Sequence, residues 1–187
     1  MQISKVLLIT TTIFSIVLLT NAPAIAEYKL GRPATSNEVT AWNLDVGPDG
    51  RGLPSGRGSA QKGKEVYETQ CASCHGTNGE GGIGDKLVGG QGTLASGKPV
   101  KTVGSFWPYA TTLFDYVRRA MPLNAPQSLT NEEVYAVSAY ILSLNGIVPS
   151  NVTLDAKSLA AIKMPNKDGF IDDTRPDVKS SACMKNC

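Results

Sequence analysis

The sequence predicts an all-α fold, and three observations support that prediction. Between Thr111 and Ala120, apolar residues face one way and charged residues the other, which is the pattern of an amphipathic helix. A second segment opens with Thr130-Asn131-Glu132-Glu133, the T-x-x-E form of a capping box. No pair of strands and no internal repeat is evident.

Start and stop signals predict where three helices lie. Ser59 is a good N-cap for the first helix, one face of which carries Gly63, Val66, Tyr67 and Gln70. Pro122 ends the second helix near Met121, because proline disfavours helical geometry in the residue before it. The apolar stripe of the third helix consists of Val134, Val137, Ile141 and Leu144. Asn145-Gly146 is its expected stop.

The first 26 residues have the features of a signal peptide. Lys5 supplies a positive charge, residues 6–19 are apolar, and Ala24-Ile25-Ala26 is a small-residue cleavage site. The apolar run is shorter than the roughly 20 residues of a spanning helix, and an uncleaved anchor is the alternative. We expect cleavage after Ala26, a periplasmic protein, and no membrane contact after cleavage.

The charge of the chain argues against two classes of partner. Its 18 basic and 16 acidic side chains give a net charge of +2, and removal of Lys5 lowers it further. Nucleic acids and anionic membrane surfaces attract strongly basic proteins. We therefore expect neither as a partner.

The clearest chemical signal is the stretch Cys71-Ala72-Ser73-Cys74-His75. C-x-x-C-H is the attachment motif of a c-type haem, in which two thiols form thioethers and the histidine binds iron. A thioredoxin-like pair would need a βαβ context, and a zinc site would need further ligands. His75 is the single histidine of the chain. We expect one haem c, held covalently by Cys71 and Cys74 and ligated by His75.

The composition and the later loops fit a buried haem. Aromatic residues are only 6% of the chain, and the macrocycle would supply the missing apolar mass of the core. The glycine-rich segment 76–97 should fold around the haem edge, placing two residues against the ring, Leu87 and Leu94. Groups that can donate to a propionate belong to Trp107 and Tyr109. Two arginines could pair with a propionate or a partner protein, or be merely solvated: Arg118 and Arg119.

Met121 is the expected sixth ligand of the iron. A haem that only carries electrons usually has both axial positions filled, and methionine raises its potential. Met121 follows the second helix and precedes a proline-containing loop, so its thioether can return over the distal haem face. Met164 and Met184 are further candidates. Any of these methionines could instead simply fill the core. An open sixth position is another alternative.

The sequence suggests one haem domain between two extensions. After the signal peptide, residues 27–58 are rich in glycine and proline and predict an irregular extension. Its apolar residues, expected to cover the domain, are Trp42, Leu44 and Val46. Residues 59–148 form the haem domain. Residues 149–187 form a polar C-terminal extension with one short helix near residues 154–164.

Cys183 and Cys187 form a second cysteine pair in the C-terminal extension. No histidine follows Cys187, so this pair is not expected to attach a haem. In an oxidising compartment a disulfide between the two is expected. An intermolecular bridge or a redox role is the alternative.

These motifs together resemble class I cytochrome c over residues 59–148. The resemblance implies that the first and last helices cross through small and aromatic residues, namely Gly63, Tyr67 and Tyr140. The family usually has Gly-Pro-x-Leu in the loop, where the proline carbonyl orients the histidine. This chain has Gly84-Asp85-Lys86-Leu87, and the Asp85 carbonyl is the nearest equivalent acceptor for the Nδ1–H group of His75.

A narrower resemblance covers most of the chain after the signal peptide. Its motifs include Trp42-Asn43-Leu44-Asp45-Val46, the stretch 102–122, Met164-Pro165-Asn166 and Arg175-Pro176-Asp177-Val178. These are similar to the cytochrome subunit of sulfane dehydrogenase in the Sox system and to haem subunits of sulfite dehydrogenases. The resemblance implies a partner with a molybdenum cofactor that passes electrons to the haem. That Sox subunit typically has two haem domains, and this chain has one.

The expected function is single-electron transfer by a periplasmic monohaem cytochrome, without catalysis by the chain itself. Electrons would come from the molybdenum-containing sulfite or sulfane dehydrogenase that the resemblance implies. Two alternatives remain open from the sequence. One is a general electron shuttle to a terminal oxidase, and the other is a haem enzyme or gas sensor with an open sixth position.

Overall fold

The computed structural model describes residues 31–175 of the 187-residue chain. It divides into two compact units, one up to Val39 and one from Thr40 onward, and each is described by itself. The expected signal peptide, Met184 and the expected Cys183–Cys187 disulfide lie outside the described residues.

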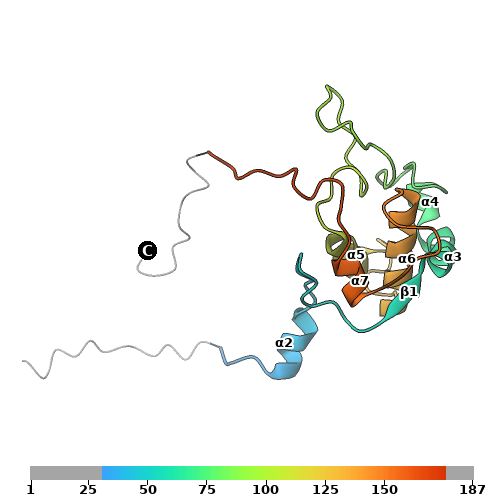
Figure 1. The fold of residues 1–187 in the computed structure, drawn as a ribbon. Coiled ribbons are helices and arrows are strands. Elements are labelled where there is room, and N and C mark those ends of the chain that lie inside the picture. The colour runs from blue at the N-terminus through green and yellow to red at the C-terminus, as the bar shows by residue number, and fades with distance from the viewer. Residues whose placement is uncertain (1–30, 176–187) are drawn as a thin grey trace, which may run out of the picture. The chain divides into compact units, whose positions relative to one another are not determined.

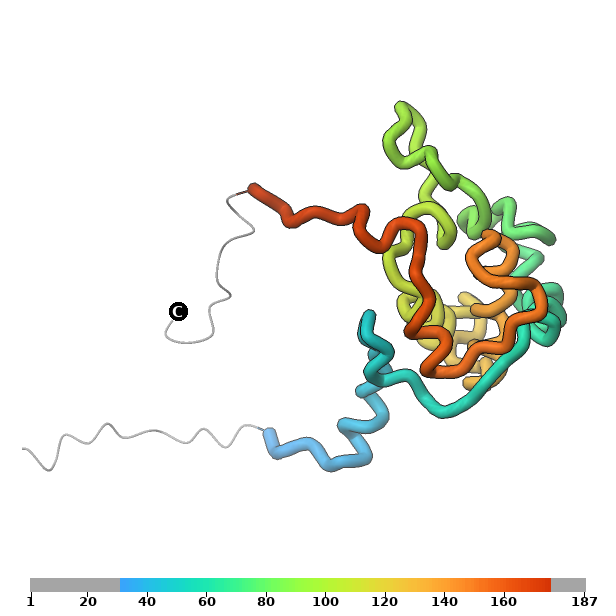
Figure 2. The backbone as a smooth tube through the Cα atoms, viewed as in Figure 1, coloured from blue at the N-terminus to red at the C-terminus, as the bar shows by residue number. Residues whose placement is uncertain are grey.

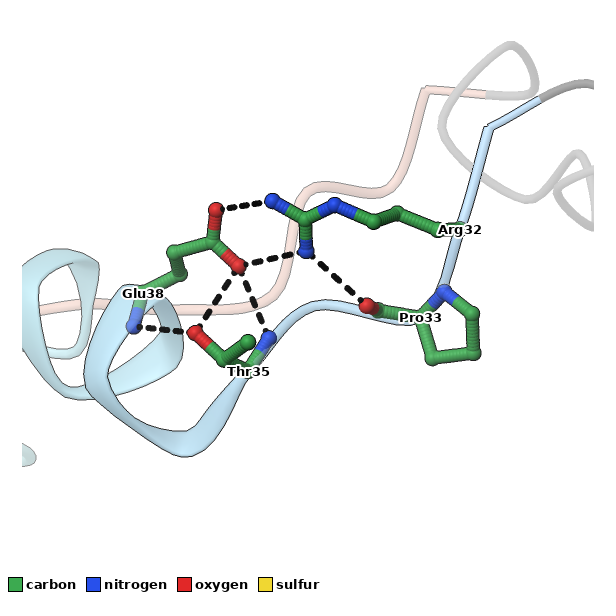
Figure 3. Close-up of polar contacts among 4 residues, drawn as sticks. All are labelled: Arg32, Pro33, Thr35 and Glu38. Atoms are coloured by element: carbon green, nitrogen blue, oxygen red, sulfur yellow. Dashed lines mark hydrogen bonds and ion pairs between the residues drawn. The ribbon is translucent and has the colours of Figure 1, made fainter.

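A short helix, α2 (Ser36–Trp42), begins in the first unit. Thr35 and Glu38 form a reciprocal cap, with the Glu38 carboxylate accepting the Thr35 N–H at 2.8 Å and the Thr35 hydroxyl accepting the Glu38 N–H at 3.3 Å (Figure 3). The Arg32 guanidinium donates to both carboxylate oxygens. Arg32, followed by the Thr35 N–H, lowers the pKa of Glu38 to about 2. This local network explains a helix that the surrounding glycines and prolines did not lead us to expect.

The second unit contains the helical body of the protein (Figure 1). Its long helices are α3 (Ala60–Gln70), α5 (Ala110–Ala120) and α6 (Asn131–Leu144). Its short elements are α4 (Ala72–His75), α7 (Ala156–Ala160), β1 (Arg57–Ser59) and β2 (Thr153–Asp155). The expected all-α fold class is confirmed, because β1 and β2 are the only strands among residues 31–175.

The caps of the long helices form as the sequence predicts. The Ser59 hydroxyl accepts the Lys62 N–H at 3.2 Å and begins α3. Thr130 and Glu133 form the reciprocal capping box that begins α6. Asn145 is the C-cap of α6, and Gly146 follows with a positive φ of 67°. Each cap satisfies backbone groups that a helix end leaves without intrahelical partners.

The two helices α3 and α6 touch backbone to backbone. A Cβ atom at Gly63 would lie 1.9 Å from the Ala136 carbonyl oxygen and 2.9 Å from the Tyr140 Cβ. One helical turn further on, the rings of Tyr67 and Tyr140 pack with centroids 5.4 Å apart. The crossing residues implied by the family resemblance, Gly63, Tyr67 and Tyr140, therefore meet.

A small antiparallel sheet corrects the expectation that the chain has no strand pair. β1 pairs with β2, with Gly58 opposite Leu154. Gly58 also lies against α6, where a Cβ would be 2.3 Å from the Ala136 N atom. Each strand has three residues, which is too short for a period of two to be visible in the sequence.

The core is centred on α6, whose buried residues are Val134, Tyr135, Ala136, Val137, Ser138, Ala139, Ile141 and Leu142. The segment that follows α6 adds three more buried side chains, Leu154, Leu159 and Met164. Met164 is only 4% exposed, although the sequence around it is poor in apolar residues. This segment therefore contributes to the core, although most of its residues are polar.

Residues 44–56, drawn in teal in Figure 2, form a strap that is hydrogen-bonded to α5 and α6. The Val46 N–H donates to the Asp115 carboxylate at 3.1 Å, and the Tyr135 hydroxyl donates to the Pro54 carbonyl at 2.8 Å. Arg119 forms an ion pair with the same Asp115. Val46 packs on the core as expected, whereas Trp42 is 86% exposed and does not cover it.

The helix crossing predicts a large cost for one added methyl group. Gly63→Ala should lower the free energy of unfolding by about 3 kcal/mol, because overpacking against a rigid carbonyl outweighs the gain in helix propensity of roughly 1 kcal/mol. Denaturant unfolding of the haem-loaded protein measures this loss. Gly97→Ala is the control, since a Cβ at Gly97 has nothing within 4 Å. A Gly63→Ala protein as stable as this control would contradict the crossing.

Candidate haem site

The C-x-x-C-H motif forms a single helical turn directly after α3. The Cys71 N–H donates to the Tyr67 carbonyl at 2.9 Å, and the His75 N–H donates to the Cys71 carbonyl at 3.0 Å. Gly76, with a φ of +80°, ends the turn. Cys71 is half-buried and Cys74 exposed, and neither forms a disulfide within residues 31–175. One rigid turn thus presents two thiols and an imidazole.

The imidazole of His75 is held in one tautomer. Its Nδ1 atom lies 2.7 Å from the Asp85 carbonyl oxygen. A carbonyl can only accept, so Nδ1 carries the proton and Nε2 keeps its lone pair for a metal. The Asp85 carbonyl therefore accepts the hydrogen bond from His75 Nδ1–H. The family resemblance named this carbonyl as the nearest equivalent of the usual proline carbonyl.

Gly84 makes the close approach of this loop to His75 feasible. A Cβ at Gly84 would lie 2.9 Å from Cε1 and 3.0 Å from Nδ1 of the His75 ring. The Gly84 N–H also donates to the Cys74 carbonyl at 2.9 Å. Sequence reasoning treated Gly84 only as part of a family motif, although a glycine next to the histidine's acceptor is a signal of tight backbone contact.

Tyr67 links α3 to the end of the motif. Its hydroxyl donates to the Gly76 carbonyl at 2.8 Å, and burial raises its pKa to about 12. Burial, and then the neighbouring Cys74, raises the pKa of the free Cys71 thiol to about 11. Before attachment Cys71 is therefore a neutral thiol in partly apolar surroundings.

The other expected haem contacts lie in varied settings. Leu87 packs on the core, while Leu94 is half-buried in the segment between α4 and α5. Trp107 packs edge-on against Tyr116, with centroids 5.8 Å apart. Tyr109 occupies the N-cap position of α5.

The candidates near the end of α5 have distinct roles in the structure. Met121 is the C-cap of α5 and is half-buried against the core. Arg119 is paired with Asp115, and the Arg118 guanidinium donates to the Leu44 carbonyl at 3.5 Å. Both arginines thus have partners within the chain. The strap anchor Asp115 was not anticipated, because a polar residue on a helix face gives no signal of burial.

No helix among residues 31–175 is both long and apolar enough to cross a membrane. The same residues contain no cluster of three or more histidine, cysteine, aspartate and glutamate side chains that could hold a metal ion.

Crossed helices with a C-x-x-C-H turn after the first define the class I c-type cytochromes. The cytochrome c family model matches residues 60–145. A chain in the crystal structure of the sulfane dehydrogenase SoxCD from Paracoccus pantotrophus is 39% identical. That match has a TM-score of 0.76 and covers 86% of this chain and 82% of that one. The protein therefore belongs to the cytochrome c family.

A second relative matches a shorter part of the chain. The thiosulfate dehydrogenase of Stutzerimonas stutzeri (strain A1501) is 32% identical over 92 residues, which is 48% of this chain and 29% of that protein. The chain thus spans less than a third of the length of this relative. Both similar proteins are named as dehydrogenases of sulfur compounds.

Family membership means that the chain carries haem c and is an electron-transfer cytochrome. The residues present fit this group. The turn offers two cysteine side chains, and the neutral imidazole of its histidine has an unprotonated Nε2 atom because the proton lies on Nδ1, which donates it in a hydrogen bond to the Asp85 carbonyl. Bound haem supplies an iron atom that cycles between two oxidation states by one electron.

The hydrogen bond from Tyr67 to the Gly76 carbonyl can be tested by comparing Tyr67 with Tyr135, which bonds to the Pro54 carbonyl. Tyr67→Phe and Tyr135→Phe each remove one hydroxyl bond of 2.8 Å to a carbonyl, so each should cost about 1 kcal/mol at neutral pH. Burial raises the pKa of both residues to about 12, above the ordinary value of about 10. Their protonated forms thus stabilise the fold below about pH 10, and this contribution is lost as the pH rises towards 12.

Denaturant unfolding between pH 7 and pH 12 checks this expectation. Each variant should lose less stability than the wild type over the alkaline range, because one titrating group is gone. Only Tyr67→Phe should also alter the haem absorption spectrum, since Tyr135 contacts the strap. Unchanged alkaline sensitivity in both variants would refute the role of the tyrosines.

Proposed function

We propose that this protein is a periplasmic monohaem cytochrome that accepts electrons from a molybdenum-containing dehydrogenase of sulfite or a sulfane compound. The observation that carries the haem assignment is the 2.7 Å contact between His75 Nδ1 and the Asp85 carbonyl. It leaves Nε2 free for iron beside two cysteine side chains. In this proposal Cys71 and Cys74 attach the haem, and His75 is the proximal ligand.

Met121 is the proposed distal ligand. It lies at the end of α5 and is half-buried against the core, so part of its side chain stays accessible to a bound haem. Met164 is 4% exposed and belongs to the core cluster, which is the role of a filler methionine. With both axial positions filled, the haem would carry electrons and would not bind a substrate or a gas.

Removal of the distal thioether gives a direct test. Met121→Ala should lower the midpoint potential and allow carbon monoxide to bind the ferrous haem, because a methionine ligand stabilises the ferrous state and blocks the sixth position. Spectroelectrochemistry and carbon monoxide titration measure these effects. Met164→Ala is the control and should lower stability by about 2–5 kcal/mol with an unchanged potential. Ready binding of carbon monoxide by the wild type would instead favour the gas-sensor alternative.

The proposed dehydrogenase partner is supported by the relatives and by exposed apolar residues next to the site. The similar proteins are named sulfane dehydrogenase and thiosulfate dehydrogenase. Ile83, which precedes Gly84, is 94% exposed, and Leu123, which follows Met121-Pro122, is 79% exposed. A contiguous exposed apolar patch marks an interaction surface, and in this proposal Ile83 and Leu123 contribute to one. Both residues adjoin the segments proposed to hold the iron.

The partner can be tested on protein isolated natively from periplasm. We expect bound molybdenum, and we expect rapid haem reduction when sulfite or thiosulfate is added without oxygen. Ile83→Ser and Leu123→Ser should slow this reduction at an unchanged potential, because they weaken docking and leave the haem intact.

Ile171→Ser is the matched control for these two variants, since Ile171 is equally exposed at 92% but lies in the C-terminal segment. A preparation that contains no molybdenum and stays oxidised with both sulfur compounds would refute the proposed partner. Its reduction by unrelated redox proteins would then favour a general shuttle to a terminal oxidase.

A further inference from the structure

Asn145, at the end of α6, is buried and fully engaged through its side-chain amide. It is 8% exposed. Its Nδ2 group donates to the Leu87 carbonyl at 3.2 Å and to the Ile141 carbonyl at 2.9 Å, and its Oδ1 atom accepts the Gly89 N–H at 3.1 Å. Both amide hydrogens are therefore used. The sequence predicted only a helix stop at this position.

The two loop residues that Asn145 holds lie just after the acceptor of the histidine proton. Leu87 and Gly89 are two and four residues after Asp85. The other end of this loop is fixed to the C-x-x-C-H turn, because the Gly84 N–H donates to the Cys74 carbonyl. Asp85 thus lies between two fixed points of the chain. Gly84 before it is bonded to the turn, and Leu87 and Gly89 after it are bonded to Asn145 at the end of α6.

The surroundings leave the Asn145 amide little freedom. A Cβ at Gly104 would lie 2.1 Å from Asn145 Oδ1, so the backbone of residue 104 lies close to the amide and leaves no room for a side chain. The Gln91 side chain donates to the Asn145 carbonyl at 3.2 Å. The Thr102 hydroxyl donates to the Gly89 carbonyl at 2.5 Å, so Gly89 is held at both its N–H and its carbonyl.

We propose that Asn145 is a positioning residue that tunes the haem through residues 76–89, the His75 loop. It holds Leu87 and Gly89 in register, and thereby keeps the Asp85 carbonyl aimed at His75 Nδ1. A hydrogen bond at Nδ1 makes a metal-bound imidazole a stronger donor, which stabilises the ferric state. This inference rests on the proposed ligation of iron by His75.

The test is the haem-loaded Asn145→Ala variant. Its midpoint potential should rise, because a weaker Nδ1 hydrogen bond makes His75 a poorer donor. In the NMR spectrum of the ferrous protein, the His75 Nδ1–H should exchange with solvent about tenfold faster, since its acceptor is no longer fixed. Asn145→Ser, a milder change that can replace only one donor, should shift both quantities in the same direction by less.

Asn166→Ala is the matched control. The Asn166 amide also donates to a backbone carbonyl, that of Phe106 at 2.7 Å, and Phe106 lies outside the loop of residues 76–89. This variant should lose stability without a change in potential or in Nδ1–H exchange. If the Asn145 variants lose only stability, as the control does, the positioning role is refuted. If the wild type itself lacks the spectrum of a histidine-ligated haem, the proposed ligation fails instead.

Discussion

The backbone contact between α3 and α6 at Gly63 and Ala136 is the constraint on which the site depends. The C-x-x-C-H turn continues directly from α3, and Asn145 ends α6. The crossing therefore fixes the positions of the C-x-x-C-H turn and of Asn145, which hold the two ends of the His75 loop. A side chain at position 63 would separate the helices and move these two anchors apart.

Within the loop, backbone groups bond to one another, and the Asn145 side chain joins the loop to α6. The carbonyl of Gly79 accepts the N–H groups of Leu87 and Val88, and that of His75 accepts the Gly81 N–H. Because the acceptor for His75 is a carbonyl, an aspartate can stand where the family usually has proline without changing the contact. The identity of residue 85 matters less than the path of the chain through it.

Local signals in the sequence predicted the parts of the fold that local interactions determine. The caps at Ser59 and Thr130 and the stop at Asn145-Gly146 involve neighbours within a few residues. The haem motif is equally local. The contacts of Asp115 with Val46 and of Tyr135 with Pro54 join residues 69 and 81 positions apart, and no local pattern encodes such pairs. The β1–β2 pairing and the burial of Met164 escaped prediction for the same reason.

The central claim is one haem held between His75 and Met121. It is tested most directly by the proton NMR spectrum of the ferrous wild-type protein. A methionine methyl group over the haem plane is strongly shielded by the ring current, and we predict one such signal whose through-bond correlations identify Met121. Assignment of that signal to Met164, or its absence from the spectrum, would contradict the account.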